Sequence, residues 1–516
     1  MLILLSFLIT AFGQPAWIHG CGALSAAFGF ALFWKGMFHF ARTRDRFLLA
    51  VLWFAAVQGV QLSWMATVDY MGPFILLVYL FLILAMGLQF GLLSLFIDPA
   101  LSWRRGLAFC GAWVIFEWLR LFFLCGFSWN PVGLALADSP YSIQFASVWG
   151  IFGLSFWVML VNVSALKALI AKSIKQVALW ASLAFFPYLF GMVHQSWIEA
   201  HIQPSKILHV ALIDTNLSPD QKELDMAPLA QWEGVLRALK DKGVDLIILP
   251  EGAFPLGAHT PSYPLSSVKK ILDPVHFPQI RAPFALFEEG GWRVSNAFML
   301  QTLSNRHQAH VIVGLDDHDF YGHYNAAFHF QPGNAPFERY EKQILVPIGE
   351  YIPFGLARFA AKHFGITHSF DRGTEGKIFA AGVPIGISIC VEETFPSLIR
   401  NLRLKGAALL VNVTNDAWFP RSKLGRQHFD HGRVRSVENG VPILRACNAG
   451  LSAGIDCFGR PMTISEGGGG EASALHFPFP IRSYSTLYTW WGDGAILGIS
   501  LGAFASYFLI RKKKLL

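Results

Sequence analysis

Charged residues are scarce in this chain, and several familiar signatures are missing. Only 15% of its 516 residues are Asp, Glu, Lys or Arg, whereas soluble domains average about one quarter. The six cysteines include no CxxC pair, which argues against a disulfide framework or a zinc site. The chain has no internal repeat, no GxGxxG motif and no P-loop.

Apolar residues take the place of the missing charges. They make up 53% of the chain, the mean hydropathy is +0.43, and a large part of the protein is therefore expected in lipid. A helix that crosses a bilayer needs ~20 apolar residues. The hydropathy predicts eight spans, near residues 1–13, 17–34, 47–68, 74–97, 106–124, 144–166, 177–195 and 490–510. Residues 1–13 lack the basic start and cleavage site of a signal peptide, so we expect a helix there.

The basic residues predict the topology. They lie between spans two and three, four and five, and six and seven, and after the last span, at Lys35, Arg42, Arg44, Arg46, Arg104, Arg105, Lys167, Lys172, Lys175 and Arg511 to Lys514. Cytoplasmic loops carry the excess of Lys and Arg, so both termini are expected in the cytoplasm and the stretch from 200 to 485 outside. For a bacterial inner-membrane protein, outside means the periplasm. Because the positive charges flank the membrane, the formal charge of +7 does not indicate a nucleic-acid partner.

Residues 200–485 differ from the flanking regions 1–199 and 486–516 in their pattern of predicted secondary structure. Strands are predicted near 207–213, 244–249, 310–315, 326–331, 337–344, 383–389, 408–413, 442–447 and 453–458. Helices are predicted at 221–240, 396–404 and 425–439. This alternation indicates an α/β layered domain.

Three predicted strands end near reactive groups: Glu251, Lys342 and Cys390. Cys390 ends an apolar run and is followed at once by carboxylates, which is a suitable place for a nucleophile. A thiol is mostly protonated at neutral pH and needs a base, for which Glu251 is available. Lys342 can supply positive charge to a tetrahedral intermediate. Glu350 and Glu392 can keep that lysine charged and oriented or assist proton transfer. Each residue alone also has an ordinary structural explanation, and the combination carries the hypothesis.

The sequence Leu249-Pro250-Glu251, then Lys342, then Cys390-x-Glu392 resembles the Glu–Lys–Cys set of the nitrilase (carbon–nitrogen hydrolase) superfamily. Further segments resemble the apolipoprotein N-acyltransferases within it, namely residues 340–353, 415–419, 427–428, 435–438, 445–450 and, in the membrane part, 127–133. The seven-span, domain, one-span layout is also that of the family. The resemblance covers essentially the whole chain. Two positions depart from the resemblance. The family usually has an aromatic residue where this chain has Val391 and phenylalanine where it has Ile348, but no catalytic group is lost.

The resemblance implies a four-layer α-β-β-α domain on a helical bundle at the periplasmic face. It implies that Cys390 takes an acyl chain from a phospholipid as a thioester and passes it to the α-amino group of a diacylglyceryl-cysteine apolipoprotein. By motif, Glu251 is the base, Lys342 the oxyanion partner and Cys390 the nucleophile, while Glu350 and Glu392 assist. No metal or organic cofactor is expected, and we expect a monomer. The donor head group, chain length and acceptor range do not follow from the sequence.

Residues 354–364 combine apolar side chains (Phe354, Phe359 and Phe364 among them) with basic ones, which suits a segment at a lipid surface. We interpret it as a substrate lid, and the alternative is an ordinary amphipathic helix packed on the domain.

Some apparent motifs have simpler explanations. Residues 316–323 contain several Asp and His residues but match no known metal-ligand spacing, so a solvated turn is expected. His428 and His431 lie one helical turn apart without an HExxH motif. Cys447 and Cys457 flank a turn and can form a disulfide or remain two core thiols.

Two other functions stay open. A membrane-anchored nitrilase-type amidase would give the thioester to water and would have an open polar pocket. A transporter or scaffold with an inactive external domain would lack one of the catalytic residues, and all three are present.

Overall fold

The computed structural model describes residues 1–70, 72–122, 126–218, 228–239, 243–288, 290–333, 336–352, 369–467 and 470–513. Its contacts divide the chain into two compact units. The helical unit comprises Met1–Ile202, Arg421–Gly440 and Ser485–Leu516, and the sheet unit comprises Gln203–Pro420 and Val441–Tyr484. The sequence predicts one domain over 200–485, but Arg421–Gly440 makes its contacts within the helical unit.

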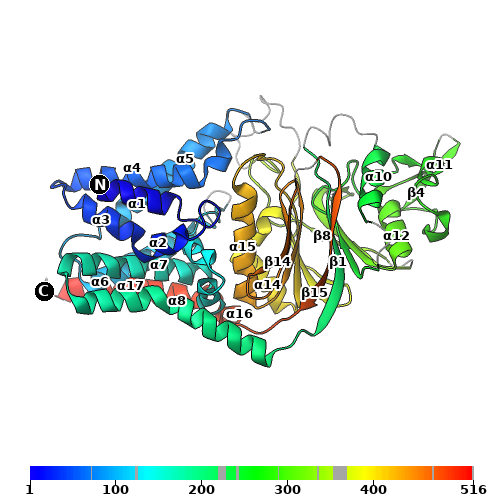
Figure 1. Ribbon diagram of the computed structural model, residues 1–516. Helices are drawn as coiled ribbons and strands as arrows, with labels where there is room; N and C mark the ends of the chain where they lie inside the picture. The colour runs from blue at the N-terminus through cyan, green and yellow to red at the C-terminus, as the bar shows by residue number, and fades with distance from the viewer. Residues whose placement is uncertain are drawn as a thin grey trace. The chain divides into compact units, whose positions relative to one another are not determined.

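The helical unit contains a helix in each of the eight predicted spans (Figure 1). These helices are α1 (Leu2–Ala11), α2 and α3 (Cys21–Leu24 and Phe30–Met37, joined by a π-helical turn), α4 (Thr43–Gln61), α5 (Ile75–Ser94), α6 (Trp103–Leu119), α7 (Ala146–Ala171), α8 (Ile174–His201) and α17 (Gly494–Lys513). Within the described residues, three helical stretches are long and apolar enough to cross a membrane by themselves: Ile75–Ser94, Ser142–Ala171 and Ile174–His201. The full set of eight spans therefore stays a prediction.

One helix of this unit has an unusual composition. Helix α15 (Leu424–Asn439) is rich in polar residues, yet 14 of its 16 residues are buried. Near its start the side chain of Gln427 donates to the carbonyl of Gln61 and accepts from the indole N–H of Trp64, at 2.6 and 3.0 Å. Near its end Glu438 accepts the backbone N–H of Ile151 at 2.7 Å. These hydrogen bonds hold α15 in the unit together with its buried apolar side chains, such as Phe429 and Val434.

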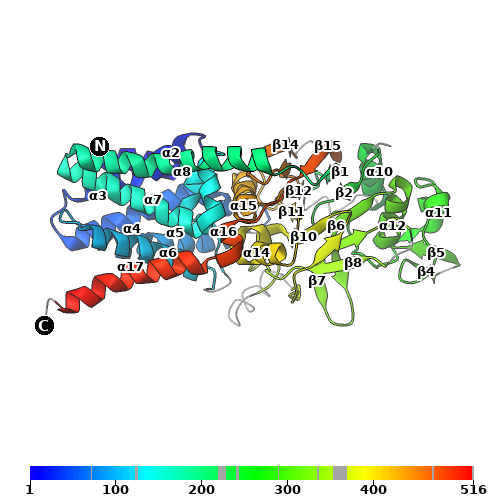
Figure 2. The same cartoon turned by 90° about the horizontal axis from the view of Figure 1, so that it is seen from below.

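The sheet unit is built on two six-stranded sheets (Figure 2). The first has the order β15-β1-β2-β6-β7-β8, with bounds Ser473–Ile481, Lys206–Asp214, Leu246–Ile248, His310–His318, His323–Phe330 and Glu338–Glu341. The second has the order β14-β13-β12-β11-β10-β9, with bounds Pro461–Glu466, Leu451–Ile455, Ile443–Asn448, Leu409–Asn415, Pro384–Ile389 and Ile378–Ala380. In each sheet three adjacent strands are parallel, β1-β2-β6 in the first and β10-β11-β12 in the second. Antiparallel strands flank them.

Alternation along the strands creates the core. Inward-facing side chains from β1, β10 and β11, such as Val210, Ile387 and Val411, pack between the sheets. The other face of the first sheet packs against α10 (Pro228–Leu239) and α12 (Asn296–His307). Helix α14 (Pro396–Leu404) contacts β10 of the second sheet. This layering is the α-β-β-α order that the resemblance implies.

Most predicted strands of this unit are confirmed within a few residues. The sequence analysis did not find α12, the edge strands β14 and β15, or a small sheet of order β3-β5-β4 (Tyr263–Pro264, Gly291–Val294 and Ala285–Glu288) beside the short helix α11 (Leu265–Val268). A short helix, α16 (Leu487–Trp491), precedes α17 in the helical unit.

Candidate active site

Glu251 follows the central parallel strand β2 of the first sheet. The backbone around it is held to β6, because the N–H of Leu249 donates to the carbonyl of Ile312 and the N–H of Gly314 to that of Pro250, at 2.8 and 3.2 Å. A Cβ atom on Gly314 would lie 2.5 Å from the Cα of Glu251. The glycine therefore allows this close approach. Ligand sites commonly form at the carboxyl ends of parallel strands, and Glu251 lies at such an end.

Cys390 occupies the corresponding place after β10 of the second sheet, at the start of a short 3₁₀ turn, η6 (Cys390–Thr394). Its φ of +51° is left-handed, a strained conformation for a residue other than glycine. Two contacts hold the turn in place: the amide of Asn412 donates to the carbonyl of Cys390 at 3.1 Å, and Glu392 accepts the N–H of Ile389 at 2.7 Å. The sharp turn presents the thiol at the end of the strand, as nucleophile turns do.

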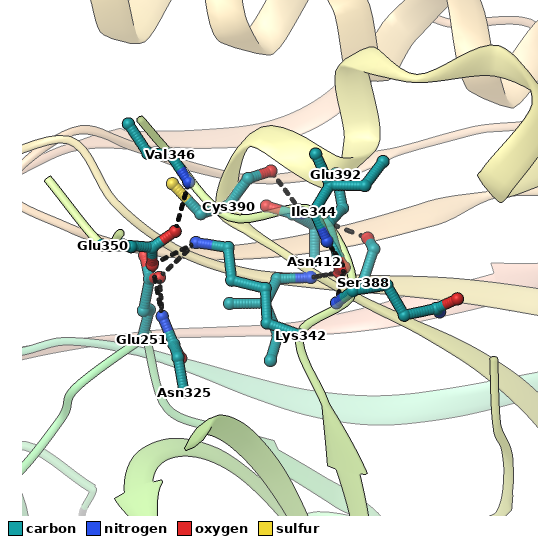
Figure 3. A network of polar contacts seen from close by, with 12 residues as sticks. Glu251, Asn325, Lys342, Ile344, Val346, Glu350, Ser388, Cys390, Glu392 and Asn412 are labelled. Atoms are coloured by element: carbon teal, nitrogen blue, oxygen red, sulfur yellow. Dashed lines mark hydrogen bonds and ion pairs between the residues drawn. The ribbon is translucent and has the colours of Figure 1, made fainter. Parts of the chain in front are cut away.

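Lys342, just after β8, brings the predicted acids together (Figure 3). Its ammonium group donates to Glu251 at 3.0 Å and to Glu350 at 2.7 Å, and its side chain is 1% exposed. The second oxygen of Glu350 accepts the N–H of Val346 at 2.7 Å. Figure 3 shows the sulfur of Cys390 on the side of this cluster where Glu350 and Val346 lie. The three residues proposed to form a triad thus lie at one site.

Asn325, in β7, belongs to the same cluster and was not found by the sequence analysis. Its side-chain amide nitrogen donates to Glu251 at 2.7 Å and to Glu350 at 2.8 Å, and its backbone carbonyl accepts the N–H of Lys342 at 2.9 Å. The side-chain amide therefore bridges both carboxylates, while the backbone of the same residue holds that of Lys342. Its sequence signal is a polar residue directly before the apolar run Ala326 to Phe328.

Burial and charge set the protonation states of the cluster. Burial raises the pKa of the Cys390 thiol, and the negative charges of Glu251 and Glu350 raise it further, while Lys342 acts against them. Burial alone would lower the pKa of Lys342, but Glu251 and Glu350 raise it well above its usual value. The resting site therefore holds a neutral thiol and a charged ammonium. Such a thiol needs a proton acceptor to become a nucleophile, and a carboxylate bound to the lysine is available for that role.

Glu392 has a different set of hydrogen-bond partners. Its carboxylate accepts the backbone N–H groups of Gln343 (2.6 Å), Ile344 (3.1 Å) and Ile389 (2.7 Å) and the hydroxyl of Tyr340 (2.9 Å). The charge of Lys342 still acts on it and lowers its pKa against the effect of burial. Glu392 thus joins the loop that carries Lys342 to the turn that carries Cys390. Of the two assisting acids, Glu350 contacts the lysine directly and Glu392 acts through the backbone.

The pKa of Glu392 yields a testable pH dependence. Burial raises this pKa from 4.5 to about 7, although the N–H donors oppose the shift. The folded protein then binds an extra proton between these values, so this group's contribution to the free energy of unfolding falls as pH rises from about 4.5 to 7. We expect Glu392→Gln to unfold at lower temperature than the parent but with a flatter pH profile. Thermal unfolding in detergent at pH 5, 6, 7 and 8 measures both effects. Parallel profiles for the two proteins would refute the assignment.

The expected lid residues Phe354, Phe359 and Phe364 lie outside the described residues. Residues 316–323, where the sequence predicts a solvated turn, include the end of β6 and the first residue of β7. Asp317 and Asp319 of this segment bind the guanidinium of Arg339, as does Glu341 of β8. His428 and His431 pack their rings against Trp129, with centroids 5.5 and 5.4 Å away. Among the described residues, no group of three or more His, Cys, Asp or Glu side chains is arranged to hold a metal ion.

The possibility of a disulfide between Cys447 and Cys457 is contradicted. Both are buried free thiols. Strands β12 and β13 pair with Ile443 opposite Ile455 and Arg445 opposite Ala453. This register places Cys447 near one end of the hairpin and Cys457 beyond the other, so the two sulfur atoms cannot meet.

Comparison with known proteins identifies the family. A model of the carbon-nitrogen hydrolase family matches residues 210–469, and a model of the apolipoprotein N-acyltransferase N-terminal domain matches residues 2–164. The apolipoprotein N-acyltransferase of Chlamydia pneumoniae is 32% identical, over 99% of this chain and 98% of its own length. That of Chlamydia trachomatis is 31% identical, over 99% and 97%. Among solved structures, a carbon-nitrogen hydrolase from Helicobacter pylori matches 59% of this chain and 95% of its own at 14% identity and a TM-score of 0.36. The chain belongs to the apolipoprotein N-acyltransferase family.

Proposed function

We propose that this protein transfers an acyl chain from a phospholipid to the free α-amino group of the diacylglyceryl-cysteine of apolipoproteins. One observation carries the proposal: a single chain joins the N-terminal domain of that family, over residues 2–164, to a carbon-nitrogen hydrolase domain, over residues 210–469. Relatives matched along 97–98% of their own length are named for this activity. An amidase of the same superfamily would need the second part alone.

The cluster supports a two-step mechanism. Glu251 takes the thiol proton as the sulfur of Cys390 attacks the ester carbonyl of the phospholipid. Negative charge then develops on the carbonyl oxygen. The ammonium of Lys342 stabilises this charge. It donates to Glu251 and Glu350 among the described residues, and an ammonium has three N–H bonds. The C–O bond breaks, Glu251 returns the proton to the leaving lysophospholipid oxygen, and a thioester remains.

The second step repeats this chemistry with an amine. The α-amino group of the apolipoprotein attacks the thioester carbonyl and gives a proton to Glu251, the C–S bond breaks, and the proton returns to the sulfur of Cys390. The products are an amide and the resting thiol, so no oxidant, metal or further reactant is required. Lys342 is buried and Cys390 is half-buried, and this limited access of water favours transfer to the amine over hydrolysis of the thioester.

The membrane setting is part of the proposal. Helices in all eight predicted spans and the basic residues between alternate spans support a multi-pass protein of the bacterial inner membrane with both termini in the cytoplasm. In this arrangement the sheet unit works in the periplasm, where it meets phospholipid and the exported apolipoprotein. The sheet unit's residues 203–420 and 441–484 lie between the seventh and eighth spans in the chain, as this topology requires.

The fate of the thioester tests the proposal. Purified enzyme in detergent is loaded with a phospholipid that carries a labelled acyl chain, and excess phospholipid is removed. A synthetic diacylglyceryl-cysteinyl peptide with a free α-amino group should then remove the label from the enzyme and become N-acylated. The same peptide with its α-amino group acetylated is the matched control and should leave the label in place. Rapid release of labelled fatty acid without any acceptor would instead establish the amidase.

A further inference from the structure

A polar stripe crosses one face of the second sheet. On β12 the neighbours Leu444 and Ala446 lie in the core between the sheets, so Arg445 points to the opposite face. Asn412 of β11 is its partner in the parallel register, and its amide donates to Ser388 of β10 at 3.1 Å. All three are at most 3% exposed. Three adjacent strands thus carry buried polar side chains that lead to the turn of Cys390.

Arg445 holds two buried acids. Its guanidinium donates to Glu393 at 2.6 Å and to Asp416 at 2.9 Å, and its Nε–H donates to the carbonyl of Leu451 at 3.2 Å. The exposed fraction of the side chain is 0% for Arg445, 1% for Glu393 and 3% for Asp416. Burial alone would lower the pKa of Arg445, but the two carboxylates raise it above its usual value. The three groups therefore form a fully buried ionic cluster.

This cluster is attached to the nucleophile. Glu393 belongs to the turn η6, three residues after Cys390. The turn is held at its start by Asn412, through the carbonyl of Cys390, as Figure 3 shows. Glu392 joins the same turn to the loop of Lys342. The bond from Arg445 to Glu393 is a further attachment, made three residues after Cys390.

A left-handed residue such as Cys390 keeps its conformation only when its surroundings hold it there. A displacement of the nucleophile by about 1 Å can cost on the order of a hundredfold in rate. The described contacts of Arg445 run to Glu393, Asp416 and the carbonyl of Leu451, so its connection to Cys390 passes through Glu393 and the turn.

We propose that Arg445, acting through Glu393, is a positioning residue that holds the Cys390 turn in its reactive geometry. This role deepens the proposed acyl transfer and rests on it for the reaction that benefits. Asp416 is the second anchor, which joins Arg445 to the end of β11. The planar guanidinium is required because it donates from two nitrogen atoms to the two carboxylates, and a lysine ammonium cannot donate to both with the same geometry.

The test uses a readout that needs no substrate. The rate of alkylation of Cys390 by iodoacetamide is followed by intact-protein mass spectrometry, per folded enzyme, well below the unfolding temperature of each variant. Arg445→Lys and Glu393→Gln should each slow alkylation about tenfold. The double variant should be no slower than Arg445→Lys alone, because both changes break the same connection, the ion pair of Arg445 with Glu393. In acylation by the phospholipid donor, both single variants should have a lower kcat than the parent and an unchanged KM.

Arg403→Lys is the matched control. Arg403 is a partly buried arginine of the sheet unit that donates to the backbone carbonyls of Ala407 at 2.7 Å and Tyr484 at 3.3 Å, so the parental alkylation rate is expected. Alkylation at the parental rate in Glu393→Gln and Arg445→Lys would overturn the proposal. So would a double variant whose fold-reduction in rate equals the product of the two single fold-reductions. Slowed alkylation in a protein that transfers no acyl chain would leave the positioning role intact and refute only the proposed function.

Discussion

Cys390→Ala is expected to abolish acyl-enzyme formation. After incubation with phospholipid, the parent protein should gain the mass of one acyl chain, and neutral hydroxylamine should remove it, as it does a thioester. The variant should show no adduct, a loss of at least about a thousandfold, because nothing else at the site can replace the sulfur as nucleophile. Intact-protein mass spectrometry followed by peptide mapping measures both the adduct and its position.

Cys457→Ala is the control for this experiment. Cys457 is also a buried thiol of the sheet unit, 1% exposed, but lies beyond the far end of the β12–β13 hairpin from the reactive turn. It should acylate at the parental rate. An adduct on any residue other than Cys390, or one that survives in Cys390→Ala, would disprove the assignment of the nucleophile.

Lys342→Met is expected to slow acylation by a factor of roughly 10² to 10³, the usual effect of removing one oxyanion partner. The ammonium also separates Glu251 from Glu350, which both contact it at 3.0 Å or less. Without it, the two carboxylates repel each other and one retains a proton to higher pH. The proton acceptor is then partly lost, so the rise of the acylation rate with pH should occur at a higher pH than in the parent.

Single-turnover acylation with labelled phospholipid between pH 6 and 9 measures this effect, and the unfolding temperature reports whether the variant is folded. Lys405→Met is the control, because Lys405 forms an exposed pair with Glu375 at 3.4 Å, and exposed pairs contribute little. Acylation of Lys342→Met at the parental rate would remove the lysine from the mechanism.

The groups that the sequence reveals are those whose chemistry is unusual for their position. Glu251, Lys342 and Cys390 stand out because charged or reactive residues directly follow apolar strands, and the fold brings the ends of those strands together. Asn325 does not stand out, because one amide within a strand reads as an ordinary polar residue. Its importance depends on the distances from its nitrogen to two acids, and those follow only from the pairing of β7 with β8.

Other differences have the same origin. The acid of Glu392 is close to Cys390 in the chain, yet its partners are backbone N–H groups of residues 343, 344 and 389, and a backbone donor has no signature in the sequence. Cys447 and Cys457 are ten positions apart, and only the register of β12 and β13 shows that they lie at opposite ends. Strands and helices were predictable where the apolar pattern was strong, as in the apolar run of β1 and the amphipathic helix α14. Strand β14 was missed because its residues are exposed or half-buried.

The assignment of α15 to the helical unit has a consequence for how the chain is completed during synthesis. Strands β11 and β12 are adjacent and parallel in one sheet, but the segment between them belongs with helices made more than 200 residues earlier. The first sheet is unfinished as well until β15 pairs with β1, Lys206 opposite Ile481. Neither sheet can be completed before its last strand has left the ribosome, and by then only the last helices remain to be synthesised. A fragment that starts at residue 203 would carry α15 without Gln61, Trp64 and Ile151, its hydrogen-bond partners. Such a fragment would therefore leave buried polar groups of α15 without the partners that satisfy them in the whole chain.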